Sequence, residues 1–263
     1  MVLGIVQGLT EFLPVSSSGH LEIGQALLGT AGEENLAFAI VVHTATVLAT
    51  ICVLWKEVAQ LLRGTFGTVK WNEEKDYAAK IIVSMIPIFI IGMFFKDKVE
   101  ALFGNGLLLV GICLCITALL LSVSELYGRR MQHQGHEVSY KDAIIIGCAQ
   151  ALAVLPGLSR SGTTIATGLL CGVKKESVAR FSFLMVLIPI LGEAFLNLTD
   201  IITGKESMPE LGWLPMLTGF AAAFVSGCFA CRFMLEIVRR QKLVYFAVYC
   251  LAAGIFAIIY GLC

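Results

Sequence analysis

Two short polar breaks in an otherwise apolar chain contain the residues most suited to chemistry. The first break, residues 14–20, reads PVSSSGH, and Gln7 and Glu11 come just before it. These two residues are four positions apart, so they share one face of a helix. Because a carboxylate in an apolar helix is costly, Glu11 indicates a functional site. Glu11 and Gln7 together predict a site for a hard divalent cation, Mg2+ or Ca2+, which takes oxygen ligands; the alternative is a hydrogen bond between packed helices.

The hydroxyl groups of Ser16, Ser17 and Ser18 lie close to His20 in the sequence. One Ser would be enough to cap the following helix through its free N–H groups, and three beside a His exceed that need. A hydroxyl with a His in reach is the arrangement that activates a nucleophile. One of these hydroxyls together with His20 is therefore expected to form a nucleophile and its base. The sequence leaves open which of them attacks, and a structural role for His20 is the alternative.

The second polar break reads PGLSRSGTT and contains Arg160. An Arg within a membrane needs a partner, and its planar fork suits a phosphate. The hydroxyls of Ser159, Ser161 and Thr164 and the N–H groups of the following helix would add donors. The alternative is that Arg160 only balances the charge of Glu11. Together the two breaks offer a carboxylate, a nucleophile with a base and a phosphate clamp, the set that hydrolysis of a phosphate ester or anhydride requires.

The composition is that of a polytopic membrane protein. Of 263 residues, 57% are hydrophobic and 14% are charged, with a mean hydropathy of +0.85. This excludes an ordinary soluble domain, in which about a quarter of residues are charged, and a disordered chain. The 19 basic and 19 acidic residues balance, so nothing indicates nucleic acid as a partner. The nine Cys are expected to pack as small apolar residues, and no signal peptide is expected.

The lengths of the apolar segments predict an all-α membrane domain with six transmembrane helices and two re-entrant helical hairpins. A helix needs about 20 apolar residues to cross the bilayer. Six segments reach or approach that length: 36–55, 78–95, 106–124, 178–199, 213–235 and 243–262. Four others cover only about 17–21 Å each: 2–13, 17–28, 142–155 and 161–172. Pro, Gly and Ser separate the members of each short pair, which favours hairpins over kinked single spans.

An internal repeat with an offset of 143 residues relates the two hairpins. The offset places Gly4 on Gly147, Gln7 on Gln150, Leu9 on Leu152, Ser16 on Ser159, Ser18 on Ser161, Gly19 on Gly162, Glu33 on Glu176 and Phe38 on Phe181. Each half would contain one hairpin and three spans, over about 1–124 and 142–263 of a single membrane domain (1–263). Because three is odd, the second half would enter from the opposite side. The result is an inverted repeat whose hairpin tips meet near the midplane.

The distribution of basic residues predicts the orientation. Thirteen of the 19 fall near the side opposite the N-terminus, and only Lys96, Lys98 and Lys205 fall near the other side. By the positive-inside rule the side opposite the N-terminus is cytoplasmic. Both termini are then expected outside, with the first hairpin opening outward.

The residues at both breaks resemble the motifs of the bacterial undecaprenyl-diphosphate phosphatase family, the bacitracin-resistance lipid phosphatases. Residues 7–20, QGLTEFLPVSSSGH, are similar to the family's Glu/Gln-x-x-x-Glu motif with its Ser-rich turn and His. Residues 156–164, PGLSRSGTT, are similar to its Pro-Gly-x-Ser-Arg-Ser-x-x-Thr motif. The chain length and the number of spans also agree, so the resemblance covers the whole chain.

The resemblance implies that the terminal phosphate is removed from a C55 polyprenyl diphosphate at the outer face of the bacterial cell membrane, with a divalent cation as cofactor. This recycles the lipid carrier for peptidoglycan synthesis and confers bacitracin resistance. By matched position, Glu11 and Gln7 would serve the metal or the diphosphate, Ser17 or His20 would be nucleophile or base, and Arg160 would hold the phosphates. The other substrate-binding residues would be Ser16, Ser18, Ser159, Ser161 and Thr164. Gln7 takes a position that is a carboxylate in some members, which leaves one charge fewer for a metal. A homodimer is one oligomeric state that the sequence leaves open.

Two other classes of protein remain as alternatives. The phosphatidic-acid-phosphatase type also combines Ser-Gly-His with Ser-Arg, but it needs a His six residues after the Arg, where this chain has Ala166. A transporter or lipid flippase would fit the inverted repeat and the broken helices. The Ser/His group beside the Arg favours hydrolysis. Four further intramembrane polar residues receive no catalytic role from the sequence: His43, Gln150, Glu193 and Asn197.

Overall fold

The structure is a computed structural model that describes residues 1–28, 36–67, 69–95, 106–130, 135–202, 212–239 and 243–262. Over these ranges the chain is all-helical, as predicted, and the single β-bridge joins His136 to Val173. The helices are α1 (Val2–Phe12), α2 (Ser17–Leu28), α3 (Leu36–Val53), α4 (Trp55–Phe66), α5 (Glu73–Phe94), α7 (Gly106–Arg130), α8 (Tyr140–Leu152), α9 (Arg160–Leu170), α10 (Lys175–Ile202), α11 (Trp213–Arg239) and α12 (Leu243–Leu262).

Four of these helices, α5, α7, α11 and α12, are long and apolar enough to cross a membrane among the described residues. The pair α3 and α4 would make a fifth span, but it is bent by 80°. The sequence placed one span over 36–55 and did not predict α4. The bend lies at Leu54, whose backbone leaves the helical region with φ −98° and ψ 26°. The four predicted short helices match α1, α2, α8 and α9 within a few residues.

Several sequence predictions fall outside the described part of the chain. Glu33, Lys96, Lys98 and Lys205 lie in undescribed segments, as do the side chains of Glu193 and Asn197.

The span predicted over 78–95 begins earlier in the structure, because α5 starts at Glu73. The side chain of Asn72 accepts a hydrogen bond from the N–H of Lys75 at 2.8 Å, and this cap adds a charged first turn to the apolar span.

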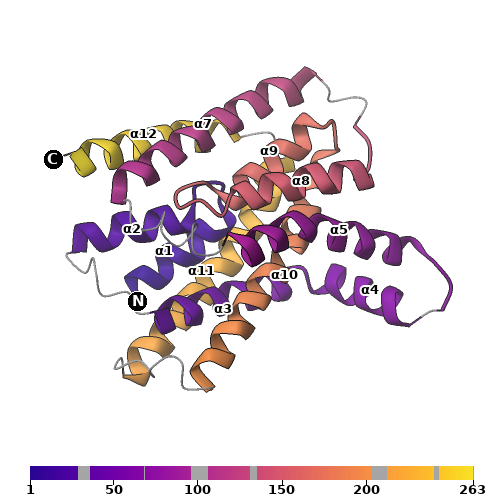
Figure 1. Cartoon of the computed structure of the whole chain (residues 1–263), viewed down its shortest axis with the longest axis horizontal. Helices are drawn as coiled ribbons and strands as arrows, with labels where there is room; N and C mark the ends of the chain where they lie inside the picture. Colours follow the sequence, from indigo (N-terminus) through magenta and orange to yellow (C-terminus); the bar gives the residue numbers. More distant parts are fainter. Residues whose placement is uncertain are drawn as a thin grey trace.

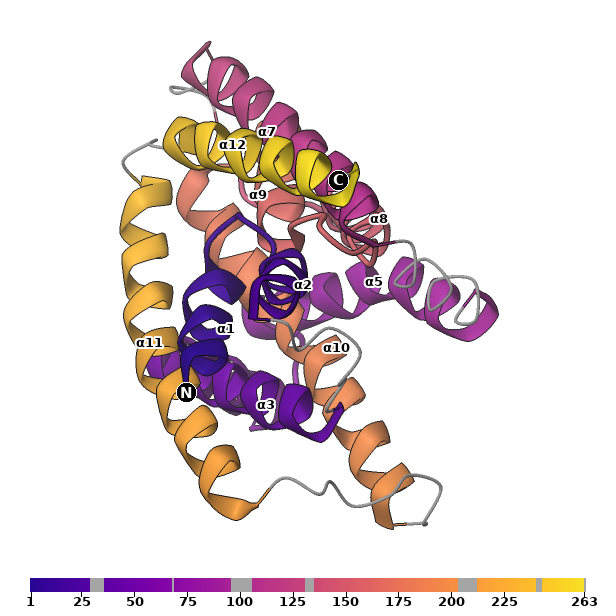
Figure 2. The ribbon, with the colours of Figure 1, turned by 90° about the vertical axis from the view of Figure 1, so that its left-hand side faces the viewer.

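Each pair of short helices folds back on itself as a hairpin. Gly24 of α2 faces Leu3 of α1, and Gly168 of α9 faces Ile146 of α8. Figures 1 and 2 show the α1–α2 hairpin in the middle of the molecule, with the α7–α12 pair on one side and α3 on the other. The long helices therefore surround the first polar break.

Glycine allows both hairpins to approach a long helix closely. A Cβ atom on Gly4 of α1 would clash with the carbonyl oxygen of Gly219 in α11, and one on Gly147 of α8 would clash with the carbonyl oxygen of Ser84 in α5. Gly4 and Gly147 are related by the offset of 143 residues. Without a hydrophobic effect between helices in lipid, such backbone-to-backbone packing holds helices together.

The last helices of the two halves, α7 and α12, run antiparallel. Gly111, near the start of α7, packs against Gly254 and Ile258, whereas Gly261 at the end of α12 packs against Leu107 and Leu108. A Cβ atom on Gly254 would lie 2.8 Å from the carbonyl oxygen of Gly111 and 2.8 Å from Cys115 Sγ. Both figures show the two helices side by side along most of their length.

Gly254→Leu is therefore expected to lower the free energy of unfolding by about 1–3 kcal/mol, the usual cost of overpacking. The measurement is the midpoint of thermal unfolding of the purified chain in detergent. Gly92→Leu in α5 is the matched control, because a Cβ atom there meets nothing within 4 Å. Equal midpoints for the two variants would contradict the close packing of α7 on α12.

Candidate active site

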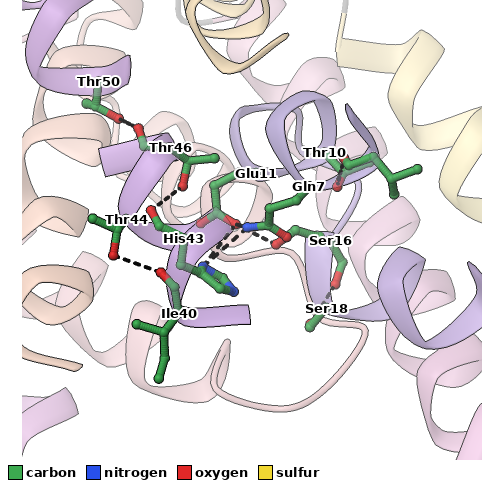
Figure 3. A network of polar contacts seen from close by, with 12 residues as sticks. Gln7, Thr10, Glu11, Ser16, Ser18, Ile40, His43, Thr44, Thr46 and Thr50 are labelled. Atoms are coloured by element: carbon green, nitrogen blue, oxygen red, sulfur yellow. Dashed lines mark hydrogen bonds and ion pairs between the residues drawn. The ribbon is translucent and has the colours of Figure 1, made fainter. Parts of the chain in front are cut away.

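Glu11 is the centre of the first polar cluster. Its Oε2 atom accepts a hydrogen bond from Ser17 Oγ at 2.6 Å and another from Gln7 Nε2 at 2.8 Å. Gln7 and Glu11 face the same side because they are one helical turn apart on α1, as predicted, and Ser17 reaches them from the first turn of α2. The structure therefore brings together three of the predicted site residues. Figure 3 shows Gln7 and Glu11 converging on one point.

His43 of α3 completes this cluster. Its Nδ1 atom lies 3.2 Å from Gln7 Nε2 and 3.9 Å from Glu11 Oε2, and Figure 3 shows the ring turned toward both. The sequence predicted no catalytic role for His43. The pattern that could have found it is the spacing of His43, Thr46 and Thr50, which places three polar residues on one face of an otherwise apolar helix.

His20 takes partners other than the expected hydroxyl of Ser17. Its Nδ1 atom lies 2.8 Å from the carbonyl oxygen of Ser16, and its Nε2 atom lies 2.8 Å from the hydroxyl of Tyr249 in α12. The rings of His20 and Tyr249 also stack, with centroids 5.5 Å apart. Ser17 instead donates to Glu11. The geometry thus pairs the hydroxyl with a carboxylate, and no pattern in the sequence indicates Tyr249.

Ser16 and Ser18 hold the first tip in shape. Ser16 has a φ of 70°, a left-handed conformation that is uncommon for residues other than Gly. Its Oγ atom accepts a hydrogen bond from the N–H of Gly19 at 3.3 Å and lies 3.3 Å from Ser18 Oγ. Ser18 Oγ in turn accepts a bond from the N–H of Gly157 at 3.5 Å. Both hydroxyls therefore have structural partners, and their predicted role in binding substrate remains a prediction.

The two hairpin tips meet, as the sequence predicts. Ser161 Oγ donates to the carbonyl oxygen of Leu13 at 3.1 Å, and Gly19 approaches Gly157 so closely that a Cβ atom would lie 3.0 Å from its Cα. Gly157 has a φ of 86° and packs against the backbone of Val110 in α7, so only Gly fits this position.

The hydroxyls of the second tip are also bound locally. Ser159 caps α9 by accepting a bond from the N–H of Gly162 at 3.1 Å, and its own N–H donates to Thr117 Oγ1 at 3.1 Å. Thr164 Oγ1 donates to the carbonyl oxygen of Arg160 at 2.9 Å. The cap begins α9 at Arg160, so its free N–H groups and the positive end of its dipole lie at the tip.

A small pocket opens beside Glu11 and joins residues from four helices. Glu11 and Arg160 both line it, and aromatic Phe12 and Phe183, whose ring centroids are 6.1 Å apart, form part of its wall. Its other lining residues are Thr46, Thr50, Ser161, Thr164, Ser182, Val186 and Ile190. Thr46, Thr50 and Ser182 were not predicted from the sequence.

Two buried polar atoms at this site have no hydrogen-bond partner among the described residues: Gln7 Oε1 and Ser182 Oγ. Unpaired buried polar groups are costly and usually mark a place for water, an ion or a ligand. An amide oxygen beside a carboxylate is a suitable donor set for a hard cation. Among the described residues no group of three or more His, Cys, Asp or Glu side chains is placed to hold a metal ion.

The fold and the pocket define a polytopic helical membrane protein with a buried site that pairs a hydroxyl and a carboxylate with a guanidinium. The chain belongs to the bacitracin resistance protein BacA family, whose family model matches residues 1–256. It is 57% identical over 258 residues to an undecaprenyl-diphosphatase of Parabacteroides distasonis, covering 98% of this chain and 96% of that one. It is 56% identical over 259 residues to an undecaprenyl-diphosphatase of Bacteroides thetaiotaomicron, with 98% and 97% coverage. An undecaprenyl-diphosphatase of Oceanobacillus iheyensis is 36% identical over 267 residues, with 98% and 94% coverage.

Proposed function

We propose that the chain hydrolyses undecaprenyl diphosphate, a C55 polyprenyl diphosphate, to the monophosphate and inorganic phosphate. The observation that carries this is the 2.6 Å hydrogen bond from Ser17 Oγ to Glu11, which lines the same pocket as Arg160. The membership of the BacA family and the activity named for its relatives support the same substrate. The reaction would recycle the lipid carrier for peptidoglycan synthesis and lower sensitivity to bacitracin.

Ser17 is the nucleophile of the proposed reaction. Its Oγ atom attacks the terminal phosphorus, while the proton moves along the existing hydrogen bond to Glu11 Oε2. The new O–P bond replaces the bond from phosphorus to the bridging oxygen, and the polyprenyl monophosphate leaves. Glu11 releases its proton to water and then takes a proton from the water molecule that hydrolyses the phosphoserine. The P–Oγ bond then breaks, inorganic phosphate departs, and Glu11 returns its proton to Ser17 Oγ along the same hydrogen bond.

Arg160 binds the phosphate oxygens and stabilises the charge that grows on them as the bridging bond breaks. Its planar fork matches two oxygens at once, and it lies at the N-terminus of α9, where free N–H groups attract the same anion. The Ser182 hydroxyl in the pocket wall, which has no partner in the described part of the chain, is a further donor. Donors fixed before the reaction, in a site with little water, are the largest contribution to most catalysis.

Glu11 and Gln7 would hold a divalent cation, Mg2+ or Ca2+. Gln7 Oε1, which has no hydrogen-bond partner among the described residues, lies on the same helix face as the Glu11 carboxylate, so the donor set fits a hard cation. Mg2+ commonly takes one or two protein ligands and completes its shell with substrate phosphates and water. When bound, such a cation would neutralise charge on the diphosphate. His43, within 3.2 Å of Gln7 Nε2, would fix the orientation of the amide.

The proposed membrane arrangement has six spans and two re-entrant hairpins in an inverted repeat over about 1–124 and 142–263 of one membrane domain. The antiparallel packing of α7 and α12, the final helix of each half, supports the inversion. The equivalent close contacts of Gly4 and Gly147 with long helices support the repeat. With the basic side in the cytoplasm, both termini lie outside and the site opens to the outer face of the cell membrane.

The purified chain is expected to release phosphate from a polyprenyl diphosphate in detergent. Arg160→Ala is expected to slow the release by about 10²–10³-fold, the cost of removing one donor to a developing charge. Arg160→Lys should recover only part of the rate, because Lys cannot bind two oxygens at once. Arg232→Ala, which removes an exposed guanidinium from α11, is the matched control. No phosphate release by the unaltered chain would refute the proposed function, and equal rates for Arg160→Ala and the unaltered chain would remove Arg160 from the reaction.

The same assay separates the two candidate nucleophiles. Substrate labelled in the terminal phosphate should leave acid-stable label on the unaltered protein and on His20→Gln, and none on Ser17→Ala. Label that persists on Ser17→Ala would place the attack on another residue.

The cation prediction can be checked by binding as well as by rate. Mn2+ binding, followed by electron paramagnetic resonance with a non-hydrolysable diphosphonate lipid present, is expected to weaken at least about tenfold in Glu11→Gln, because even loss of an outer partner of a ligand costs 10–100-fold. Glu57→Gln in α4 is the control. Unchanged binding in Glu11→Gln would remove Glu11 from the cation site, and a chelator that leaves phosphate release unchanged would remove the cation from the reaction.

The orientation can be checked in intact cells with a membrane-impermeant maleimide. A Lys205→Cys variant is expected to react from outside, and a Lys174→Cys variant only after the membrane is opened, with the unaltered chain as the background for its own Cys residues. The opposite pattern would reverse the proposed orientation and would leave the proposed chemistry untouched.

A further inference from the structure

The helix α4 carries an exposed apolar stripe outside the bundle. It turns away from α3 by 80° at Leu54, and Figure 1 shows the α4–α5 pair extending from the side of the molecule. Trp55, Leu62 and Phe66 recur at helical spacing on its outer face, with exposed fractions of 61%, 52% and 81%. Trp71, after the helix, is 69% exposed. A row of large apolar side chains with aromatic ends is unfavourable in water and favourable at a membrane interface.

A basic edge runs along this stripe. Lys56 and Arg63 are seven residues apart, so they lie on one face, adjacent to the stripe, and both are exposed. They line a shallow concavity between α4 and the start of α5, together with Gln60. The side chain of Gln60 donates to Glu74 Oε1 at 3.2 Å, which places this carboxylate on the α5 wall of the concavity. Neither Lys56 nor Arg63 has a carboxylate within 4.0 Å among the residues that the structure describes.

Packing against the rest of the fold fixes the inner face of α4. The outer face therefore cannot rotate toward the helix bundle. Val58 and Leu61 pack against the main hydrophobic core. Gly64 packs directly on the side chain of Glu74, and its carbonyl oxygen accepts a hydrogen bond from Asn72 Nδ2 at 2.9 Å. The stripe and the basic edge are therefore held outward by the rest of the fold.

We propose that α4 lies in the membrane interface and binds anionic phospholipid headgroups through Lys56 and Arg63, with Trp55, Leu62 and Phe66 inserted among the upper acyl chains. The occupant is a bilayer surface because the apolar stripe and the cations are adjacent along one helix that leaves a membrane bundle at a sharp angle. Each Lys or Arg near an anionic surface contributes about fivefold to local binding. This inference does not depend on the proposed phosphatase chemistry.

The test uses the fluorescence of Trp55 in the full chain reconstituted into bilayers. The chain has three Trp, and Trp71→Phe with Trp213→Phe leaves Trp55 as the only one. Brominated lipid is added at equal mole fraction as phosphatidylglycerol or as phosphatidylcholine, in a phosphatidylcholine bilayer. Brominated phosphatidylglycerol is expected to quench Trp55 at least about twice as strongly, because two cations enrich it locally.

Two double variants make the result specific. In the variant with Lys56→Gln and Arg63→Gln, the two brominated lipids should quench Trp55 equally. In the variant with Lys141→Gln and Lys174→Gln, which removes the same charge elsewhere, brominated phosphatidylglycerol should still quench Trp55 more strongly. Equal quenching by both lipids before any charge is removed would overturn the headgroup site. Absence of quenching by either lipid, with emission typical of water, would overturn the interfacial position of α4.

Discussion

The contact between the two hairpin tips is the interaction on which the rest of the structure depends. Each tip interrupts a helix in an apolar surrounding, where broken backbone is tolerated only if protein or a lined cavity surrounds it. Each tip supplies hydrogen-bond partners to the other: Ser161 donates to the carbonyl oxygen of Leu13, and the N–H of Gly157 donates to Ser18 Oγ. Because the tips touch, Glu11 from one hairpin and Arg160 from the other line a single pocket.

Close helix packing fixes where that contact occurs. Gly4 sets α1 on α11, Gly147 sets α8 on α5, and Gly157 sets the second tip on α7. Each approach brings backbone against backbone, which leaves no side chain that could change rotamer and loosen the position. Closely packed helices therefore help to place Glu11 and Arg160 beside one pocket.

The sequence predicted the parts of the structure that follow from local periodicity. Residue types and spacing were enough to place Gln7 and Glu11 on one face, to find the four short helices and to predict that the tips meet. They were not enough for partners that come from distant helices. Tyr249 and Ser182 are ordinary residues of apolar helices, and only the packing brings the first to His20 and the second to the pocket. Proximity in sequence misled in one case, since His20 is close to Ser17 along the chain but bonds elsewhere.

The offset of 143 residues has a consequence for how the chemistry is divided. It places Ser16 on Ser159 and Ser18 on Ser161, and between them it places Ser17 on Arg160. The two tips thus share one scaffold and differ at its central residue, where one has a hydroxyl and the other a guanidinium. In the proposed reaction, two identical copies of either half would bring together two nucleophiles with nothing to hold the phosphate, or two phosphate-binding groups with nothing to attack it. The proposed chemistry needs this asymmetry at more than one matched position, since the offset also places Glu11 on Val154.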